Sequence, residues 1–362
     1  MILNKFTSWI TFGILLFAIF SCKKETPEQA VAKLPVEEEN ADGNLPYKWL
    51  STYSFFEGEL NKLHQNSELL EYSPASSLFT DYAFKSRFVS IPKDSIAEII
   101  DGEINFPEGT IFIKNFYYPE DFRKPEDKKR IIETRLLILG SSGWEAYPYI
   151  WNEAQTDAQL KVVGGQTKVK FTNLDGKEQV IDYLIPNKNQ CKSCHNKNEQ
   201  MAPIGAQIKH LNWEKTEGAS PKNQLIVWQE KGKLNGFESP LSHPSLINYE
   251  DKNQTLNLRA RAYLDINCAH CHNAEGPAST SGLFLDYEET DPLKLGLNKT
   301  PVAAGKGAGK FTYDILPGKP DESILLHRMK STEVGVAMPE IGRTTVHEEG
   351  IQLIREWILS LK

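Results

Sequence analysis

Residues 255–272 have the sequence TLNLRARAYLDINCAHCH, and this segment decides how the second half of the chain is interpreted. Before the cysteines, apolar residues recur mostly on one broad face, which predicts a helix from Thr255 to Ile266. That helix runs directly into a Cys-x-x-Cys-His motif, which ends at His272. The motif occurs once more, as CKSCH, at residues 191–195. Two copies in one chain indicate that both sites bind the same kind of group.

The spacing of these four cysteines predicts two covalently bound c-type haems. In such a site two thiols add to the two vinyl groups of a haem, and the histidine that follows reaches the iron. The predicted attachment residues are Cys191, Cys194, Cys268 and Cys271, and the predicted iron ligands are His195 and His272. One structural zinc ion on the four thiols and two local disulfides are the alternatives. Neither alternative requires a histidine directly after each pair.

The helices expected around the second motif resemble those of class I cytochrome c. A second helix is predicted from Asp321 to Met329, entered through Pro320. Thr345 and Glu348 have capping-box spacing and predict the start of the last helix. In the class I fold the first helix leads into the haem motif and the last helix crosses it. The resemblance therefore implies an all-α domain.

Met338 is the expected sixth ligand of the second iron. It lies in the sequence GVAMP, just before the last predicted helix, which resembles the Met-Pro ligand loop of class I cytochromes. A thioether ligand raises the reduction potential of haem iron. We expect Met329 to lie in the core. His327 and His347 are expected at the surface, and either is a backup ligand.

The chain before the first motif contains predicted strands where a class I domain would have helices. Strands are expected at residues 83–89, 110–114 and 134–139, followed by a hairpin of 162–169 and 180–185 around an Asn-Leu-Asp-Gly turn. The predicted fold class is α+β, with a β-rich haem domain followed by an all-α domain.

Part of this β-rich half resembles the β-sheet cytochromes, a group that includes cytochrome c-prime-beta. The similarity lies in FPEGTIFIK at 106–114, the later Gly-Trp pair and the terminal motif. It implies a five-coordinate haem with an open distal pocket, and it raises Lys114 as a neighbour of that haem, against the alternative of an exposed strand lysine. Arg87, Arg135 and Trp144 are candidates for propionate contacts or the pocket wall, and ion pairs or ordinary core packing are the alternatives.

The distal ligand of the first iron is left open by the sequence. The position is vacant, or Met201, His210 or a residue of the β-rich half such as His64 takes it. Met201 follows His195 by few residues, so a chain passing around the haem edge has little slack.

Over its whole length the chain resembles a poorly characterised family of bacterial dihaem c-type cytochromes. The segments that carry this resemblance are SLFTDYAFKSRF at 77–88, IETR at 132–135, Gly143-Trp144, YIWN at 149–152 and NKNQCKSCH at 187–195. The family is defined by its cofactors, and the resemblance implies no particular reaction.

The N-terminus predicts export. A short basic start and an apolar run end just before Cys22, as in a secretory signal. The small residue before Cys22 resembles a lipobox, which implies lipidation of Cys22; a plain signal peptide and an uncleaved anchor are the alternatives. Lys23 favours the outer membrane, with the protein facing the periplasm or the cell surface. The expected organisation is a signal peptide at 1–21, a lipidated flexible tether at 22–44, the β-rich domain at 45–215, a linker at 216–250 and the cytochrome c-like domain at 251–362.

The composition limits the classes of partner. A net charge of −7 argues against nucleic acid, which needs a basic surface. The expected function is electron transfer between periplasmic or membrane redox partner proteins. The alternative is a haem oxidoreductase, for example a peroxidase or a small-nitrogen-compound oxidoreductase. In that case catalysis would occur at the first haem and the second haem would relay electrons.

Overall fold

The computed structural model describes residues 45–217 and 220–362. The predicted signal peptide, the lipidation site Cys22 and the tether lie outside the described residues. Within the described ranges, no helix has both the length and the apolar character needed to cross a membrane.

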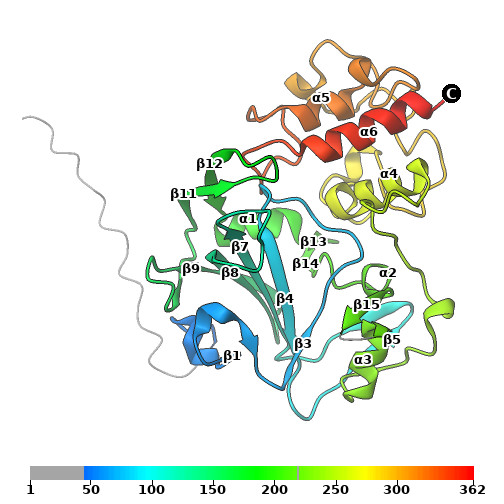
Figure 1. Ribbon diagram of the computed structural model, residues 1–362. Helices are drawn as coiled ribbons and strands as arrows, with labels where there is room; N and C mark the ends of the chain where they lie inside the picture. The colour runs from blue at the N-terminus through cyan, green and yellow to red at the C-terminus, as the bar shows by residue number, and fades with distance from the viewer. Residues whose placement is uncertain (1–44, 218–219) are drawn as a thin grey trace, which may run out of the picture. The chain divides into compact units, whose positions relative to one another are not determined.

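A six-stranded antiparallel sheet forms the framework of the first half, in the order β10-β9-β8-β7-β4-β3 (Figure 1). Its strands are β3 (Leu69–Glu71), β4 (Phe84–Ser90), β7 (Ile111–Pro119), β8 (Lys129–Gly140), β9 (Gly143–Trp151) and β10 (Ala158–Leu160). The three predicted strands correspond to β4, β7 and β8. The sheet buries apolar side chains on both faces, which explains why the middle of β7 and of β8 is almost continuously buried.

The predicted hairpin is confirmed as β11 (Gly165–Thr172) and β12 (Glu178–Ile185). Its turn places Gly176 at φ +77°, which glycine adopts without steric cost. The chain then enters α1 (Lys188–Cys194) through a capping box. The side chain of Asn187 accepts from the backbone of Gln190 at 2.8 Å, and the side chain of Gln190 accepts from the backbone of Asn187 at 3.0 Å. The first motif therefore lies on a short, well-capped helix.

Residues 216–250, which we expected to form a linker, contribute to the core of the first half. They include α3 (Gln224–Glu230) and β17 (Leu234–Asn235), which pairs in parallel with β5 (Ala97–Ile100). Trp228 and Phe237 are buried in the same apolar cluster as Leu70 and Phe112 of the main sheet. The remaining short elements here are β6 (Glu103–Asn105), β13 (Asn196–Lys197), β14 (Gln200–Met201), α2 (Ile208–Leu211), β15 (Glu214–Glu217) and β16 (Ser220–Asn223); β1 (Phe56–Glu57) and β2 (His64–Gln65) pair near the start of the described chain.

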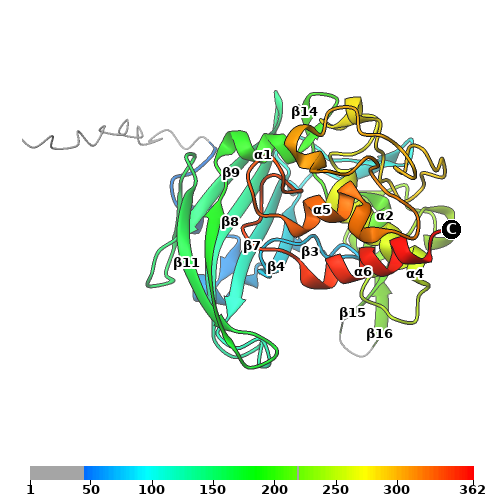
Figure 2. The ribbon, with the colours of Figure 1, turned by 90° about the horizontal axis from the view of Figure 1, so that it is seen from above.

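The second half is helical, and α4 (Leu256–Leu264), α5 (Ile324–Lys330) and α6 (Glu348–Ser360) lie together in both views of the chain (Figures 1 and 2). The hydroxyl of Thr255 caps α4, and the helix continues through Asp265–Ala269 into the second motif, as predicted. The last helix packs on the first in one apolar cluster. A Cβ at Gly350 would clash with the hydroxyl of Tyr263, so glycine allows this close approach.

Two helix starts differ from the prediction. Pro320–Glu322 forms a separate 3₁₀ turn, and α5 begins only at Ile324. The last helix begins at Glu348, with His347 at its N-cap position and no side-chain cap. Thr345 makes no capping box, because both its hydroxyl and its backbone N–H donate to Asp81 at 2.8 Å.

Candidate cofactor-binding sites

The second motif opens onto a cavity of about 820 Å³. Its walls include Cys268, Cys271, His272 and Met338, so the structure brings all four predicted residues of the second site together. The volume lies within the range of about 300–1,000 Å³ that is usual for cofactor pockets.

His272 is held in the form that binds metal. Burial lowers its pKa to about 4, against a smaller opposing effect of the backbone of Leu283. The imidazole is therefore neutral near pH 7, as iron ligation requires. Its Nδ1 atom is buried and makes no hydrogen bond of normal geometry. Burial also raises the pKa of the Cys268 thiol to about 12.

The loop that carries Met338 is held by Arg343. One guanidinium nitrogen of Arg343 donates to the carbonyl of Met338 at 2.9 Å and to that of Ser331 at 2.7 Å. The same nitrogen lies within 3.3 Å of the carbonyls of Arg328 and Met329. Because these carbonyls belong to α5 and to the segments around Met338, Arg343 ties the methionine loop to the end of that helix.

Asp81, from the β-rich half, holds the chain just after Arg343. Its carboxylate accepts the backbone N–H of Thr344 at 2.8 and 2.9 Å and the hydroxyl of Thr344 at 3.1 Å. It also accepts both donors of Thr345. Asp81 is only 2% exposed, so these four donors satisfy a carboxylate that is almost without water.

His347 also differs from the sequence expectation of a surface histidine. Its ring stacks on Phe79, with centroids 4.3 Å apart, and its Nδ1 atom lies 3.1 Å from the hydroxyl of Tyr263. It lines the larger cavity, and burial lowers its pKa to about 4. His347 therefore lines the same cavity as Met338, with its ring fixed between Phe79 and Tyr263.

The first motif opens onto a smaller cavity of about 80 Å³ between α1 and the sheet. Cys191 and His195 line it. The Nδ1 atom of His195 is 2.9 Å from the carbonyl of Ala202, an arrangement that fixes the ring and leaves Nε2 for a metal. Burial lowers the pKa of His195 to about 4, so this imidazole is neutral as well.

Three cations cross the floor of the smaller cavity in one row. Arg87 on β4 lies opposite Lys114 on β7, and Lys114 lies opposite Arg135 on β8. Glu133 is the carboxylate paired with Arg135. Burial, followed by the neighbouring Arg87, lowers the pKa of Lys114 well below its usual range. Like charges in direct cross-strand register destabilise a sheet, so the flanking arginines disfavour the charged form of Lys114.

The candidate distal ligands of the first iron do not line this cavity. Among its described lining residues His195 is the sole histidine, and there is no methionine. Met201 packs at the edge of the neighbouring apolar cluster, and His64 is exposed on β2. His210 is buried elsewhere, with its Nε2 atom 3.2 Å from Asp265. Trp144, a candidate wall residue, instead packs against Phe112 with ring centroids 5.4 Å apart.

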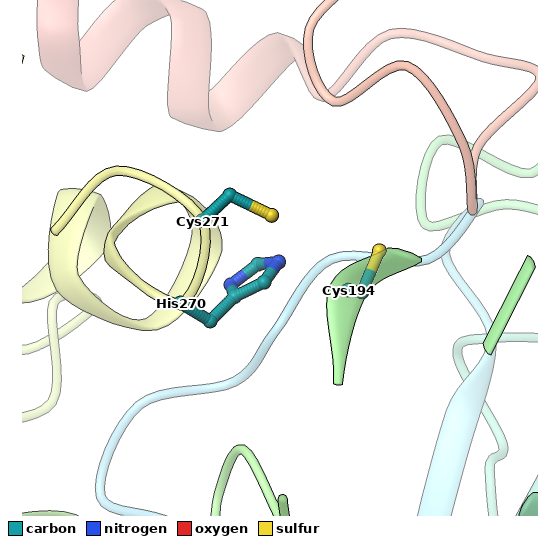
Figure 3. Close-up of side chains that lie close together, drawn as sticks. All are labelled: Cys194, His270 and Cys271. Atoms are coloured by element: carbon teal, nitrogen blue, oxygen red, sulfur yellow. The ribbon is translucent and has the colours of Figure 1, made fainter. Parts of the chain in front are cut away.

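The two motifs meet at one cluster of side chains. The ligand atoms of Cys194, His270 and Cys271 all lie within 4.8 Å of one another. Figure 3 shows Cys194 at the end of α1 facing His270 and Cys271 from the turn after α4. The pKa of Cys194 is lowered, chiefly because the Cys271 thiol hydrogen-bonds to it, and the pKa of Cys271 is raised by the same contact.

Several residues of these sites carry no local sequence signal. Asp81 and Arg343 lie in irregular segments, and their partners become visible only in three dimensions. His270 is an unspecified position of its motif. Comparison with protein-family models, with curated proteins and with solved structures gives no match.

Proposed function

We propose that this chain is an exported dihaem c-type cytochrome that transfers electrons between periplasmic or membrane redox partners. One observation carries the proposal: two thiols, a neutral imidazole and a methionine line one cavity of about 820 Å³. This donor set is the one that a His/Met-ligated c-type haem requires. Lipidation at Cys22, with attachment to the outer membrane, belongs to the same proposal.

The residues of the second site fit a haem in their donor chemistry. Cys268 and Cys271 would be the attachment thiols, His272 the proximal ligand and Met338 the sixth ligand. Arg343 keeps the backbone of Met338 in place. The packing of α6 across α4 supports a class I cytochrome c-like arrangement for this half. When bound, the haem supplies one-electron transfer.

The first site fits a haem in its chemistry and is small in volume. Cys191 and His195 face the cavity, and Arg87 and Arg135 in its lining are of the kind that would pair with haem propionates. Cys194 lines the larger cavity instead. A cavity of about 80 Å³ is well below the usual range, so the structure as it stands has no room for a haem at the first site.

A second candidate function rests on this first site. Because no methionine or second histidine lines its cavity within the described chain, the position opposite His195 would be open to a small molecule. This observation favours a haem oxidoreductase with catalysis at the first haem and relay through the second.

The test is to produce the full chain in a bacterium that matures c-type cytochromes. Intact mass and the pyridine haemochrome spectrum should show two covalent haems. The paired variants Cys191→Ala/Cys194→Ala and Cys268→Ala/Cys271→Ala should each retain one. Bound zinc and no haem would refute the proposal. Carbon monoxide binding by the reduced protein, or peroxide turnover, would favour the oxidoreductase, whereas two low-spin haems without ligand binding would leave only the electron carrier.

A further inference from the structure

Four polar side chains lie in one row across the sheet, at the smaller cavity. Arg87, Lys114 and Arg135 are direct cross-strand partners on β4, β7 and β8. The row extends to Tyr72, just after β3, whose backbone N–H donates to the carbonyl of Arg87 at 3.0 Å. Side chains of directly opposed residues point to the same face of a sheet. All four residues line the smaller cavity, so this row forms its polar side.

Two members of this row have polar atoms without a partner. Arg87 is 8% exposed and Tyr72 is 6% exposed. Within residues 45–217 and 220–362, neither side chain forms a hydrogen bond, and Arg87 forms no ion pair. Arg135, in contrast, is paired with the carboxylate of Glu133 at 2.5 Å. Because buried polar groups usually have a partner, the cavity offers two donors that a ligand can satisfy, together with the fixed positive charge of Arg87.

The size and the lining of the cavity limit what these donors can bind. A water molecule takes up about 30 Å³ of liquid, so a cavity of about 80 Å³ admits only a few non-hydrogen atoms. Phe112, Leu137 and Ile266 form apolar walls, which disfavour a doubly charged ion more than a singly charged one because the cost of desolvation grows with charge. Among the described lining residues there is no aspartate or glutamate, so a ligand that must donate a proton finds no carboxylate to accept it.

We propose that this cavity binds a small planar oxyanion of charge −1, with the chemistry of nitrate or formate, through Arg87 and Tyr72. The guanidinium of Arg87 pairs with two oxygens of the anion, and the hydroxyl of Tyr72 donates to it. The amine of Lys114, next to Arg87 in the row, can donate a further hydrogen bond in either charge state. One negative charge balances the one charge of Arg87. The inference uses no haem and does not rest on the proposed function.

The test is a calorimetric titration of the full chain, purified as for the haem count, with sodium nitrate and with sodium formate. The anion of the buffer is a bulky organic sulfonate that the cavity cannot admit, and the ionic strength is held constant. We expect saturable binding of one nitrate or one formate per chain, and weaker binding of sulfate, which carries a second charge. Absence of saturable binding of both planar anions, or tighter binding of sulfate, would overturn the proposal.

A matched pair of arginine variants locates the binding. Arg87→Gln removes the charge and the fork of donors, and it should weaken nitrate binding by about 10- to 100-fold, as the loss of hydrogen bonds from a charged group typically does. Arg130→Gln, at an exposed arginine of β8, should bind nitrate as the wild type does. Equal affinities in the two variants would show that nitrate binds elsewhere, and the assignment would fail.

Tyr72→Phe decides the question if Arg87→Gln does not fold. This change removes only the hydroxyl and keeps the ring against Phe112, with centroids 5.6 Å apart in the wild type. Nitrate binding should weaken by about 2- to 10-fold, because one neutral hydrogen bond is lost, while the thermal unfolding midpoint without nitrate stays near that of the wild type. Wild-type affinity in this folded variant would show that the anion does not occupy the cavity.

Discussion

Asp81→Asn should release the methionine loop from the β-rich half. The amide keeps one acceptor oxygen and presents an NH₂ group where the second oxygen receives Thr344. The Thr344 hydroxyl can rotate to accept one hydrogen of this NH₂ group, and the Thr344 N–H keeps the remaining oxygen at 2.8 Å, so the second NH₂ hydrogen is left without an acceptor among the groups that contact Asp81. A buried donor left unsatisfied costs about 1–3 kcal/mol. Taking about 2 kcal/mol, the open form of the loop should become roughly 30-fold more populated.

Hydrogen exchange at the Thr344 and Thr345 amides measures this opening without reference to any cofactor. Both amides should exchange faster by about that factor in Asp81→Asn. In the haem-loaded protein, the absorption band of methionine-ligated ferric iron should weaken as Met338 leaves. Asp94→Asn, at an exposed aspartate of the same half, is the control. If Asp81→Asn exchanges at the control rate, the carboxylate does not hold the loop and our reasoning fails.

Three further predictions concern the sites and their junction. Met338→Leu should make the second haem high-spin and lower its potential, whereas Met329→Leu, at the other methionine that lines this cavity, should change neither in visible spectra and redox titration. Burial opposes the charge of Asp265, but His210 and Lys209 outweigh it and hold its pKa near 2. This lowered pKa contributes about 2–3 kcal/mol to the free energy of unfolding above pH 4, and the contribution is lost as the pH falls through 2. Asp265→Asn should therefore reduce the change in the free energy of unfolding between pH 4 and 2, as measured by urea denaturation. Lys114→Met should raise the unfolding free energy of the haem-free, reduced chain by about 1 kcal/mol, since it removes an amine whose charged form burial and Arg87 disfavour; a fall would show that the Lys114 amine stabilises the sheet.

The elements predicted correctly are those whose signal is local. The hairpin has alternating strands around an Asn-Leu-Asp-Gly turn, and both strands and turn are present. The helix into the second motif has a threonine cap and an apolar face, and it begins within one residue of the predicted start. In each case the backbone hydrogen bonds form within the element itself, so distant residues have little influence on its secondary structure.

The residues that were misjudged are those for which a distant partner competes with a local pattern. Thr345 has capping-box spacing with Glu348, yet Asp81 takes its donors because a buried carboxylate needs them more than an exposed helix end does. Residues 216–250 contain the Gly, Pro and Ser typical of a linker. Trp228, however, is large and apolar, and it is buried in the core of the first half. His347 has a polar side chain, which favours the surface, yet its ring stacks on Phe79. The nearby sequence does not predict this contact.

The two sites differ in how far their own residues satisfy the hydrogen bonds and charges around them. Around the second site, Arg343 and Asp81 satisfy the methionine loop with hydrogen bonds that need no cofactor, so its geometry is preorganised. At the first site, Arg87, Lys114 and Arg135 lie in register with one carboxylate between them. Burial and the neighbouring Arg87 disfavour the charged form of Lys114, and a bound anion would favour it. The geometry of the second site needs no bound group to hold it. Such a site suits outer-sphere electron transfer, which requires little movement of the surrounding residues. The first cavity is small and is lined by three basic side chains. A small anionic molecule should therefore have its strongest effect there, and this is the place to test for substrate chemistry.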